Sequence, residues 1–189
     1  MFETEAHSFL LFLNSIENIE LYEKDSRHEE PRRLITVKIA DKCLEQVHDA
    51  RARFKRDITA DTSLTSAVHV SYDLTIELVH HHANGDDVTV TKRYLVTQYY
   101  AGGQGTDMLK KCVEDKTSMN LPWVGIALPL NEGKSQKPGG QLFCFLPLPT
   151  EKNGASGFNF HVNGYFAVSQ NRSDLVYLEL FHVWKFKPL

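Results

Sequence analysis

The sequence contains 189 residues, of which 42% are hydrophobic and 24% are charged. This composition is typical of a single globular domain and excludes a disordered chain. The formal net charge of −3 excludes the strongly basic surface of a whole-chain nucleic-acid binder. No apolar run approaches the about 18 residues of a membrane span. We therefore expect neither nucleic acid nor a membrane span among its interactions.

The N-terminal segment and the cysteines predict a cellular location. The acidic residues Glu3 and Glu5 precede an apolar run at residues 9–13 that is too short for a secretory signal. The cysteines are odd in number and far apart, which is typical neither of a disulfide framework nor of a metal site; they are Cys43, Cys112 and Cys144. The sequence thus predicts a cytoplasmic protein with reduced thiols.

Helical and strand patterns alternate in the first third of the chain. Apolar residues recur at every third or fourth position in residues 4–16 and 41–57, which predicts two helices. Apolar and polar residues alternate in residues 19–22 and 34–40, which predicts two strands. The charged residues 23–33, which include a proline, predict the loop between them.

A long hairpin is the clearest pattern in the sequence. From residue 67 to residue 100, apolar and polar residues alternate on both sides of a polar turn, as expected for a sheet with one wet face. Asn84 and Gly85 in that turn suit the positive φ angles of a tight hairpin.

The second half of the chain predicts shorter elements. A short helix is expected at residues 107–113, and strands are expected at residues 124–130, 141–148 and 160–168. Together with the hairpin, these elements predict an α+β fold, in which a mainly antiparallel sheet carries a few packed helices.

Two residue groups suggest ligand binding but lack a complete motif. His80 and His82 would face the same way on a strand, yet no third or fourth metal ligand is evident nearby. The glycine-rich residues 101–106 lie between a strand and a helix, yet they lack the spacing of a phosphate-binding loop. We expect a polar turn and a plain loop.

Two further groups suggest catalysis or anion binding. A hydrolase would need a local nucleophile motif, which is absent around the candidate residues His161, Ser169, Asp174 and Cys144. A basic cluster near the end of the second helix could meet an acidic partner or a phosphate, but a solvated helix end is favoured; its members are Arg51, Arg53, Lys55 and Arg56. We therefore predict no enzyme, and no catalytic, cofactor-binding or metal residues.

An ordered set of motifs does carry a family resemblance. The segments WVGIALPL, GGQLFCFLPLP and FHVNGYFAVSQNR follow one another from Trp123 onward, and residues 9–19 form a helix-and-strand motif near the N-terminus. This order resembles the repeated region of the sacsin family of very large chaperone-like proteins. The resemblance extends over residues 8–172, with a variable middle.

The resemblance implies a function and a set of partners. In that family the corresponding segment follows an ATPase module similar to that of the ninety-kilodalton heat-shock chaperones. The nucleotide motifs of that module are absent here. The resemblance therefore implies a chaperone or co-chaperone segment in protein folding and quality control, with no cofactor of its own. Its expected partners are client proteins or other chaperones and the adjacent ATPase module of a larger chain.

Asn171 and Arg172 match the asparagine–arginine segment of the family. Because an arginine after a strand can approach a phosphate or an acidic partner, we consider this pair a relay or interaction site. A surface salt bridge is the alternative. Ser173 departs from the family, which usually has a second arginine there.

The family pattern ends near Asp174. We therefore predict one α+β domain over residues 1–174, and a divergent tail or truncated end over residues 175–189. If the chain is a remnant or a short form of a larger protein, the alternative function is a stand-alone protein-interaction module without ATP coupling.

Overall fold

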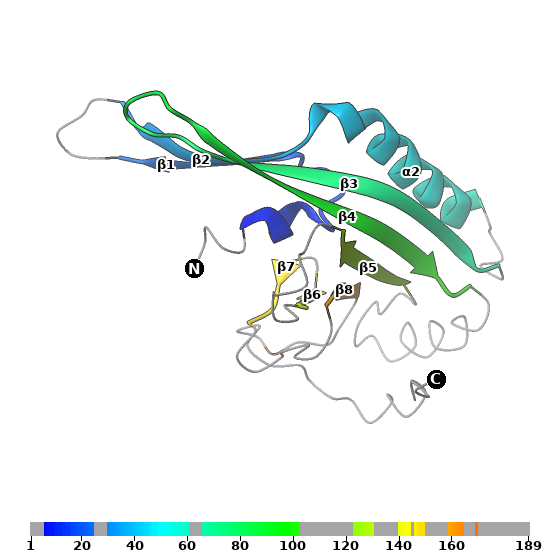
Figure 1. Cartoon of the computed structure of the whole chain (residues 1–189). Helices are drawn as coiled ribbons and strands as arrows, with labels where there is room; N and C mark the ends of the chain where they lie inside the picture. Colours follow the sequence, from blue (N-terminus) through cyan, green and yellow to red (C-terminus); the bar gives the residue numbers. More distant parts are fainter. Residues whose placement is uncertain are drawn as a thin grey trace.

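The computed structural model describes most of the N-terminal half and selected strands of the rest, namely residues 6–24, 30–60, 66–102, 123–130, 140–144, 146–149, 159–164 and 169. Its main feature is one curled sheet (Figure 1). Eight strands lie in the spatial order β1-β2-β3-β4-β5-β8-β6-β7. They are β1 (Asn18–Glu23), β2 (Arg32–Ile39), β3 (Val68–His80), β4 (Val88–Tyr100), β5 (Trp123–Pro129), β6 (Leu142–Cys144), β7 (Leu146–Pro147) and β8 (His161–Gly164).

The expected α+β fold with a few packed helices is wrong. Within the described residues there is one α-helix, α2 (Asp41–Ala60), and the sheet is mixed because β6 and β8 pair in parallel. The N-terminal helix expected at residues 4–16 is only a 3₁₀ turn, η1 (Ala6–Leu10). The helix expected at residues 107–113 lies outside the described residues.

The N-terminal segment has a physical reason to leave the α-helical conformation. Leu10, Leu11 and Phe12 are consecutive and all almost fully buried. Consecutive residues in an α-helix point about 100° apart, so three in a row cannot all face one surface. A short 3₁₀ turn followed by irregular chain lets each side chain enter the core.

The long hairpin is confirmed. Strands β3 and β4 pair from Val68 opposite Tyr100 to His80 opposite Val88. The turn is longer than the expected tight turn, since it comprises residues 81–87. Gly85 has the expected positive φ, +81°, and its N–H donates to the carbonyl of His82.

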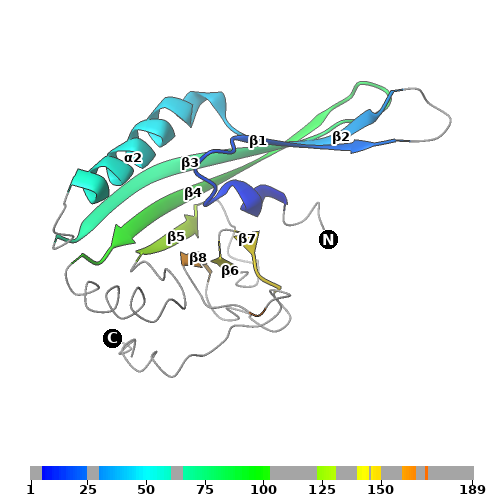
Figure 2. The same ribbon diagram turned by 180° about the vertical axis from the view of Figure 1, so that it is seen from behind.

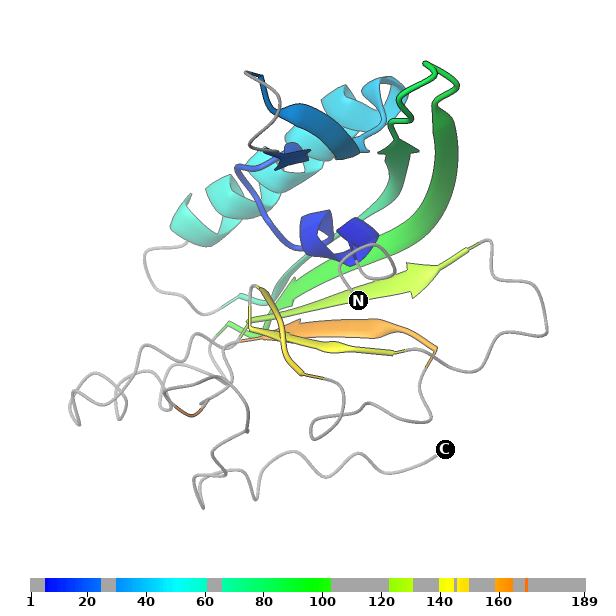
Figure 3. The ribbon, with the colours of Figure 1, turned by 90° about the vertical axis from the view of Figure 1, so that its left-hand side faces the viewer.

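The concave face of the sheet holds the core. Figure 3 shows η1 inside the curl, and α2 lies along β3 in Figure 1. Phe12, which follows η1, reaches the far strands, where its ring lies 5.1 Å from the ring of Phe143 in β6. Gly125 in β5 permits this approach, because a Cβ there would lie 3.0 Å from Phe12 Cε1. Most of the core side chains come from this face and from α2; the largest are Tyr94, Phe12, Phe143, Leu10, Leu11, Ile39, Leu74 and Ile76.

The remaining sequence expectations are partly met. The strands expected at residues 19–22, 34–40 and 124–130 are β1, β2 and β5, and the helix at residues 41–57 is α2 with a longer C-terminus. The strand expected at residues 141–148 is divided into β6 and β7, which pair antiparallel.

Figure 2 shows the ends of β1–β2 and of β3–β4 projecting together beyond α2.

Of the helices in the described ranges, none has the length and apolarity needed to cross a membrane.

Two glycines with positive φ provide a test of the fold. At Gly85 (φ +81°) an added Cβ would meet nothing within 4 Å, whereas at Gly102 (φ +62°) it would lie 2.3 Å from the carbonyl oxygen of Ser66. We expect Gly85→Ala to lower the free energy of unfolding by about 1–2 kcal/mol, the cost of left-handed backbone alone. Gly102→Ala should cost at least about 1 kcal/mol more, because the backbone must also move.

Urea denaturation of the two variants measures the difference. Gly85→Ala is the matched control, since it changes the backbone conformation without a clash. Equal losses of stability in the two variants would show that Gly102 does not pack against Ser66 as described.

Candidate interaction site

The histidine triplet has a structural role in the hairpin turn. His81 Nε2 lies 2.9 Å from the Thr36 hydroxyl and its Nδ1 lies 2.7 Å from Asp87. The hydrogen bond from His81 lowers the pKa of the Asp87 carboxyl. In the described part of the chain, no three histidine, cysteine or acidic residues converge as metal ligands. The hydrogen bonds of His81 fit a polar turn.

The glycine-rich loop can be placed only in part. Gly102 packs tightly against Ser66, and residues 103–106 lie outside the described residues. Of the suggested hydrolase residues, Asp174 also lies outside them. His161 lies between two aromatic rings, 5.9 Å from Tyr94 and 5.7 Å from Phe143 by ring centroids. This packing makes His161 a core side chain.

A second histidine, which the sequence did not reveal, lies beside His161. His7 in η1 is buried and stacks on Tyr94, and Lys92 Nζ donates to His7 Nε2 at 3.2 Å. Burial, followed by the charge of Lys92, lowers the pKa of His7 to about 3 and the pKa of His161 to about 4; His161 also contributes to the shift of His7. Both imidazoles are therefore neutral near pH 7.

The basic cluster on α2 divides between core and surface. Arg53, Lys55 and Arg56 are exposed, as expected for a solvated helix end. Arg51 is not, since it is only 8% exposed and its Nε donates to the Tyr72 hydroxyl at 3.3 Å. Gln98 of β4 donates to the same hydroxyl oxygen at 3.3 Å, so Tyr72 joins α2 to two strands.

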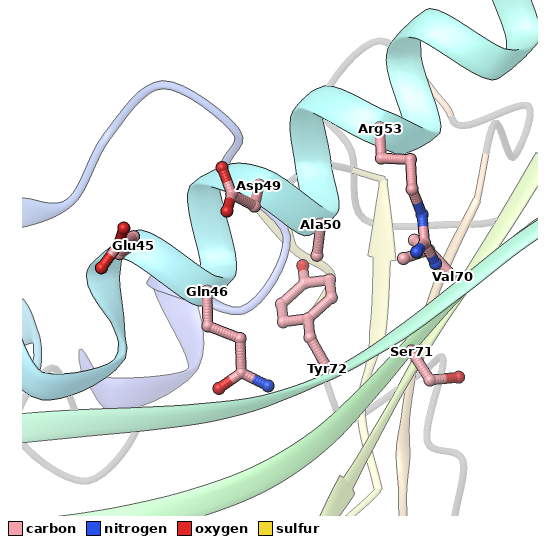
Figure 4. Close-up of a pocket in the computed structure, with 8 residues that line it drawn as sticks. All are labelled: Glu45, Gln46, Asp49, Ala50, Arg53, Val70, Ser71 and Tyr72. Atoms are coloured by element: carbon pink, nitrogen blue, oxygen red, sulfur yellow. The ribbon is translucent and has the colours of Figure 1, made fainter.

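A groove of about 470 Å³ lies between α2 and β3 (Figure 4). Residues 70–72 of β3 form one wall. The other wall is the outward flank of the helix, from which Gln46 and Arg53 reach toward the strand; it consists of Glu45, Gln46, Asp49, Ala50 and Arg53. The groove thus has an apolar floor beside Ala50 and Tyr72 and charged groups along its rim.

An apolar surface covers part of the opposite, outer face of the sheet. Leu95 in β4 pairs with Leu128 in β5, and Tyr99 pairs with Val124. The large exposed apolar residues of this surface are here called the outer patch. They are Leu95, Tyr99, Ile126 and Leu128, each 36–39% exposed. Because these strands are neighbours, the four side chains form one surface.

The expected relay residues, Asn171 and Arg172, lie outside the described residues. The predicted boundary at residue 174 lies outside them as well.

Comparisons with known proteins support the family resemblance. No family model and no solved structure matches the chain. The chain is 27% identical to human sacsin over 191 aligned residues, which cover 95% of this chain and 4% of sacsin. This similarity supports a sacsin-related segment. The expected resemblance is thus confirmed, for a piece that spans about 4% of the length of its relative.

The buried histidines predict a loss of stability in acid. Each imidazole has a folded-state pKa below the ordinary 6.5, so the unfolded chain takes up protons first. Above pH 7 the two imidazoles do not change the free energy of unfolding. As the pH decreases from 6.5 to about 4, the free energy of unfolding falls. The maximal slope is about 1.4 kcal/mol per pH unit for each imidazole.

Urea denaturation at a series of pH values measures this slope. We expect His161→Gln to remove roughly half of it. His69→Gln is the matched control, because His69 is exposed on the outer face. The contribution of His161 is disproved if His161→Gln and wild type lose stability in parallel over this range.

Proposed function

We propose that the chain is a chaperone or co-chaperone segment that assists protein folding and quality control in the cytoplasm, without a nucleotide site of its own. The observation that carries this proposal is the relation to sacsin along 95% of the chain. Client proteins, other chaperones and the adjacent ATPase module of a larger chain are its proposed partners.

The outer patch supports the client-binding part of the proposal. Unfolded chains expose apolar side chains, and burying them against a partner removes apolar surface from water. The outer patch offers an apolar surface on paired strands rather than a shaped pocket, so its contacts with a partner depend on the apolar area that is buried more than on one particular sequence. Its strands are also paired on both sides, since β4 lies between β3 and β5, and β5 between β4 and β8. Their backbone groups are therefore used within the sheet, and the side chains provide the contact surface.

The outer patch predicts suppression of aggregation. In molar excess, the chain should reduce the light scattering of thermally unfolding citrate synthase. Replacing two apolar patch residues by threonine, which is polar but suits a strand, in Leu95→Thr with Ile126→Thr, should abolish most of this effect. The matched control is Val88→Thr with Val90→Thr, because these exposed valines lie at the far end of β4.

Unfolding by urea establishes that both double variants remain folded. Equal suppression by the two double variants would exclude the outer patch as the client surface. Absence of suppression by the wild type would favour a stand-alone interaction module.

Asn171 and Arg172 remain the proposed relay to the ATPase module. If Arg172 contacts the module or its nucleotide, adding the chain should alter the ATPase rate of the neighbouring module. Arg172→Ala should abolish that change, because the guanidinium supplies the charge. Arg56→Ala, on the exposed side of α2, is the charge-matched control. A steady-state ATPase assay measures the effect, and an unchanged response with Arg172→Ala would remove Arg172 from the mechanism.

A further inference from the structure

Strand β3 has an open edge over half its length. Strand β2 covers β3 only from Ile76, opposite Ile39, to His80, opposite Ile35. The rest of β3, from Val68 to Thr75, pairs with β4 on one side and with no strand of the described residues on the other.

The pattern of hydrogen bonds shows which backbone groups face this edge. The N–H of His81 donates to the carbonyl of Leu34, and the carbonyl of Thr75 accepts from Ala40 N–H. Odd-numbered residues of β3 therefore point their backbone groups toward β2. By the two-residue period of a strand, His69, Ser71 and Asp73 point theirs toward the open edge. Among the described residues, no backbone hydrogen bond uses these groups.

The edge is open because the chain turns from β2 into α2. Ala40 makes the last backbone bond to β3, and α2 begins at Asp41, which pairs with Lys38. The Cys43 thiol, 3.7 Å from the Thr75 carbonyl, fixes the first turn of the helix there. From this point α2 runs back along β3 (Figure 1), and the groove of Figure 4 separates the helix flank from the strand.

We propose that an extended peptide binds in this groove as an additional strand, paired with the backbone of His69, Ser71 and Asp73. An extended chain provides alternating donors and acceptors for the open edge, and its inward side chains then meet the helix flank. The occupant is a peptide of defined charge pattern. Antiparallel pairing is proposed because β2 and β4, the neighbours of β3, both run antiparallel to it.

The charges of the helix flank define that pattern. Glu45 and Arg53 are at opposite ends of the groove, with Asp49 between them. Eight residues of helix span about 12 Å, close to the roughly 13 Å between strand residues i and i+4. A peptide antiparallel to β3 enters at the Glu45 end. From its N-terminus, the peptide therefore carries a basic side chain, then an apolar side chain beside Ala50, and then an acidic side chain. The acidic residue comes four positions after the basic residue.

Among the described strands, β1 offers a second edge with a different character. Its charged side chains are engaged within the hairpin with β2, where Arg33 pairs with Glu20 and Arg32 with Glu23. Charged side chains of this kind protect an edge against pairing. On α2, by contrast, Glu45, Asp49 and Arg53 make no ion pair within the described part of the chain, so they remain available to a ligand.

Fluorescence anisotropy with the full chain tests the proposal. The probe is a labelled heptapeptide, TKTVTET, in which the inward residues are lysine, valine and glutamate. Its matched control is TETVTKT, with the same composition and reversed charges. We expect TKTVTET to bind about two- to fivefold more tightly than the control, the range of an exposed ion pair, and Arg53→Glu to remove this preference.

Ser71→Pro tests the backbone pairing directly. Proline removes the Ser71 N–H, which faces the open edge rather than β4, and should weaken binding of TKTVTET about tenfold. Ser71→Val is the matched control, because it loses the hydroxyl bond to Thr97 (2.9 Å) but keeps the N–H. In wild type, bound peptide should slow hydrogen exchange of the Ser71 and Asp73 amides.

Clear results would overturn the proposal. It fails if the wild type binds neither peptide, if TKTVTET binds no better than TETVTKT, or if exchange at Ser71 and Asp73 is unchanged. Self-association of the chain that competes with the peptide would assign the edge to a second copy instead. If Ser71→Pro does not fold, Arg53→Glu and the exchange data still decide.

The inference is independent of the proposed chaperone activity. The groove lies beside α2, whereas the outer patch lies on the other face of β4 and β5, so the variants Leu95→Thr and Ile126→Thr should leave peptide binding unchanged. Failure of aggregation suppression and failure of peptide binding are thus separate results.

Discussion

The pairing of β3 with β4 is the constraint on which the rest of the structure depends. Thirteen residues of each strand pair without a break. Because side chains alternate between faces, this register assigns Tyr72 and Leu74, with Val96 and Tyr94 opposite them, to the concave face. A one-residue shift of β4 against β3 would turn Tyr94 and Val96 away from the core and onto the outer face. The core, the position of η1 and the contact with α2 all follow from that assignment.

Local periodicity made these main elements predictable. The alternation of residues 67–100 and the helical spacing of residues 41–57 are properties of the sequence itself, and they correspond to the hairpin and to α2. The N-terminal segment was not predictable in this way. Its apolar residues satisfy a helical spacing, yet Leu10, Leu11 and Phe12 are all buried in succession, and only the concave sheet around them determines that conformation.

Long-range contacts also explain why the candidate sites could not be derived from motifs. His7 and Lys92 are 85 positions apart, and only the curl of the sheet brings them together. Arg51 resembles its exposed basic neighbours in sequence, but the helix turns it toward Tyr72. The groove exists because β2 ends at Ile39 while β3 continues. The family resemblance, in contrast, depended on an ordered set of motifs, and the similarity to sacsin confirmed it.

The end of β2 therefore has two consequences for interaction. It frees the edge of β3 for backbone pairing, which requires an extended ligand of defined direction, and it places the flank of α2 beside that ligand. The outer patch has no comparable directionality, since its apolar side chains lie on strands paired on both sides. Because one surface is an edge of β3 and the other is the opposite face of β4 and β5, the proposed peptide site and the outer patch do not overlap.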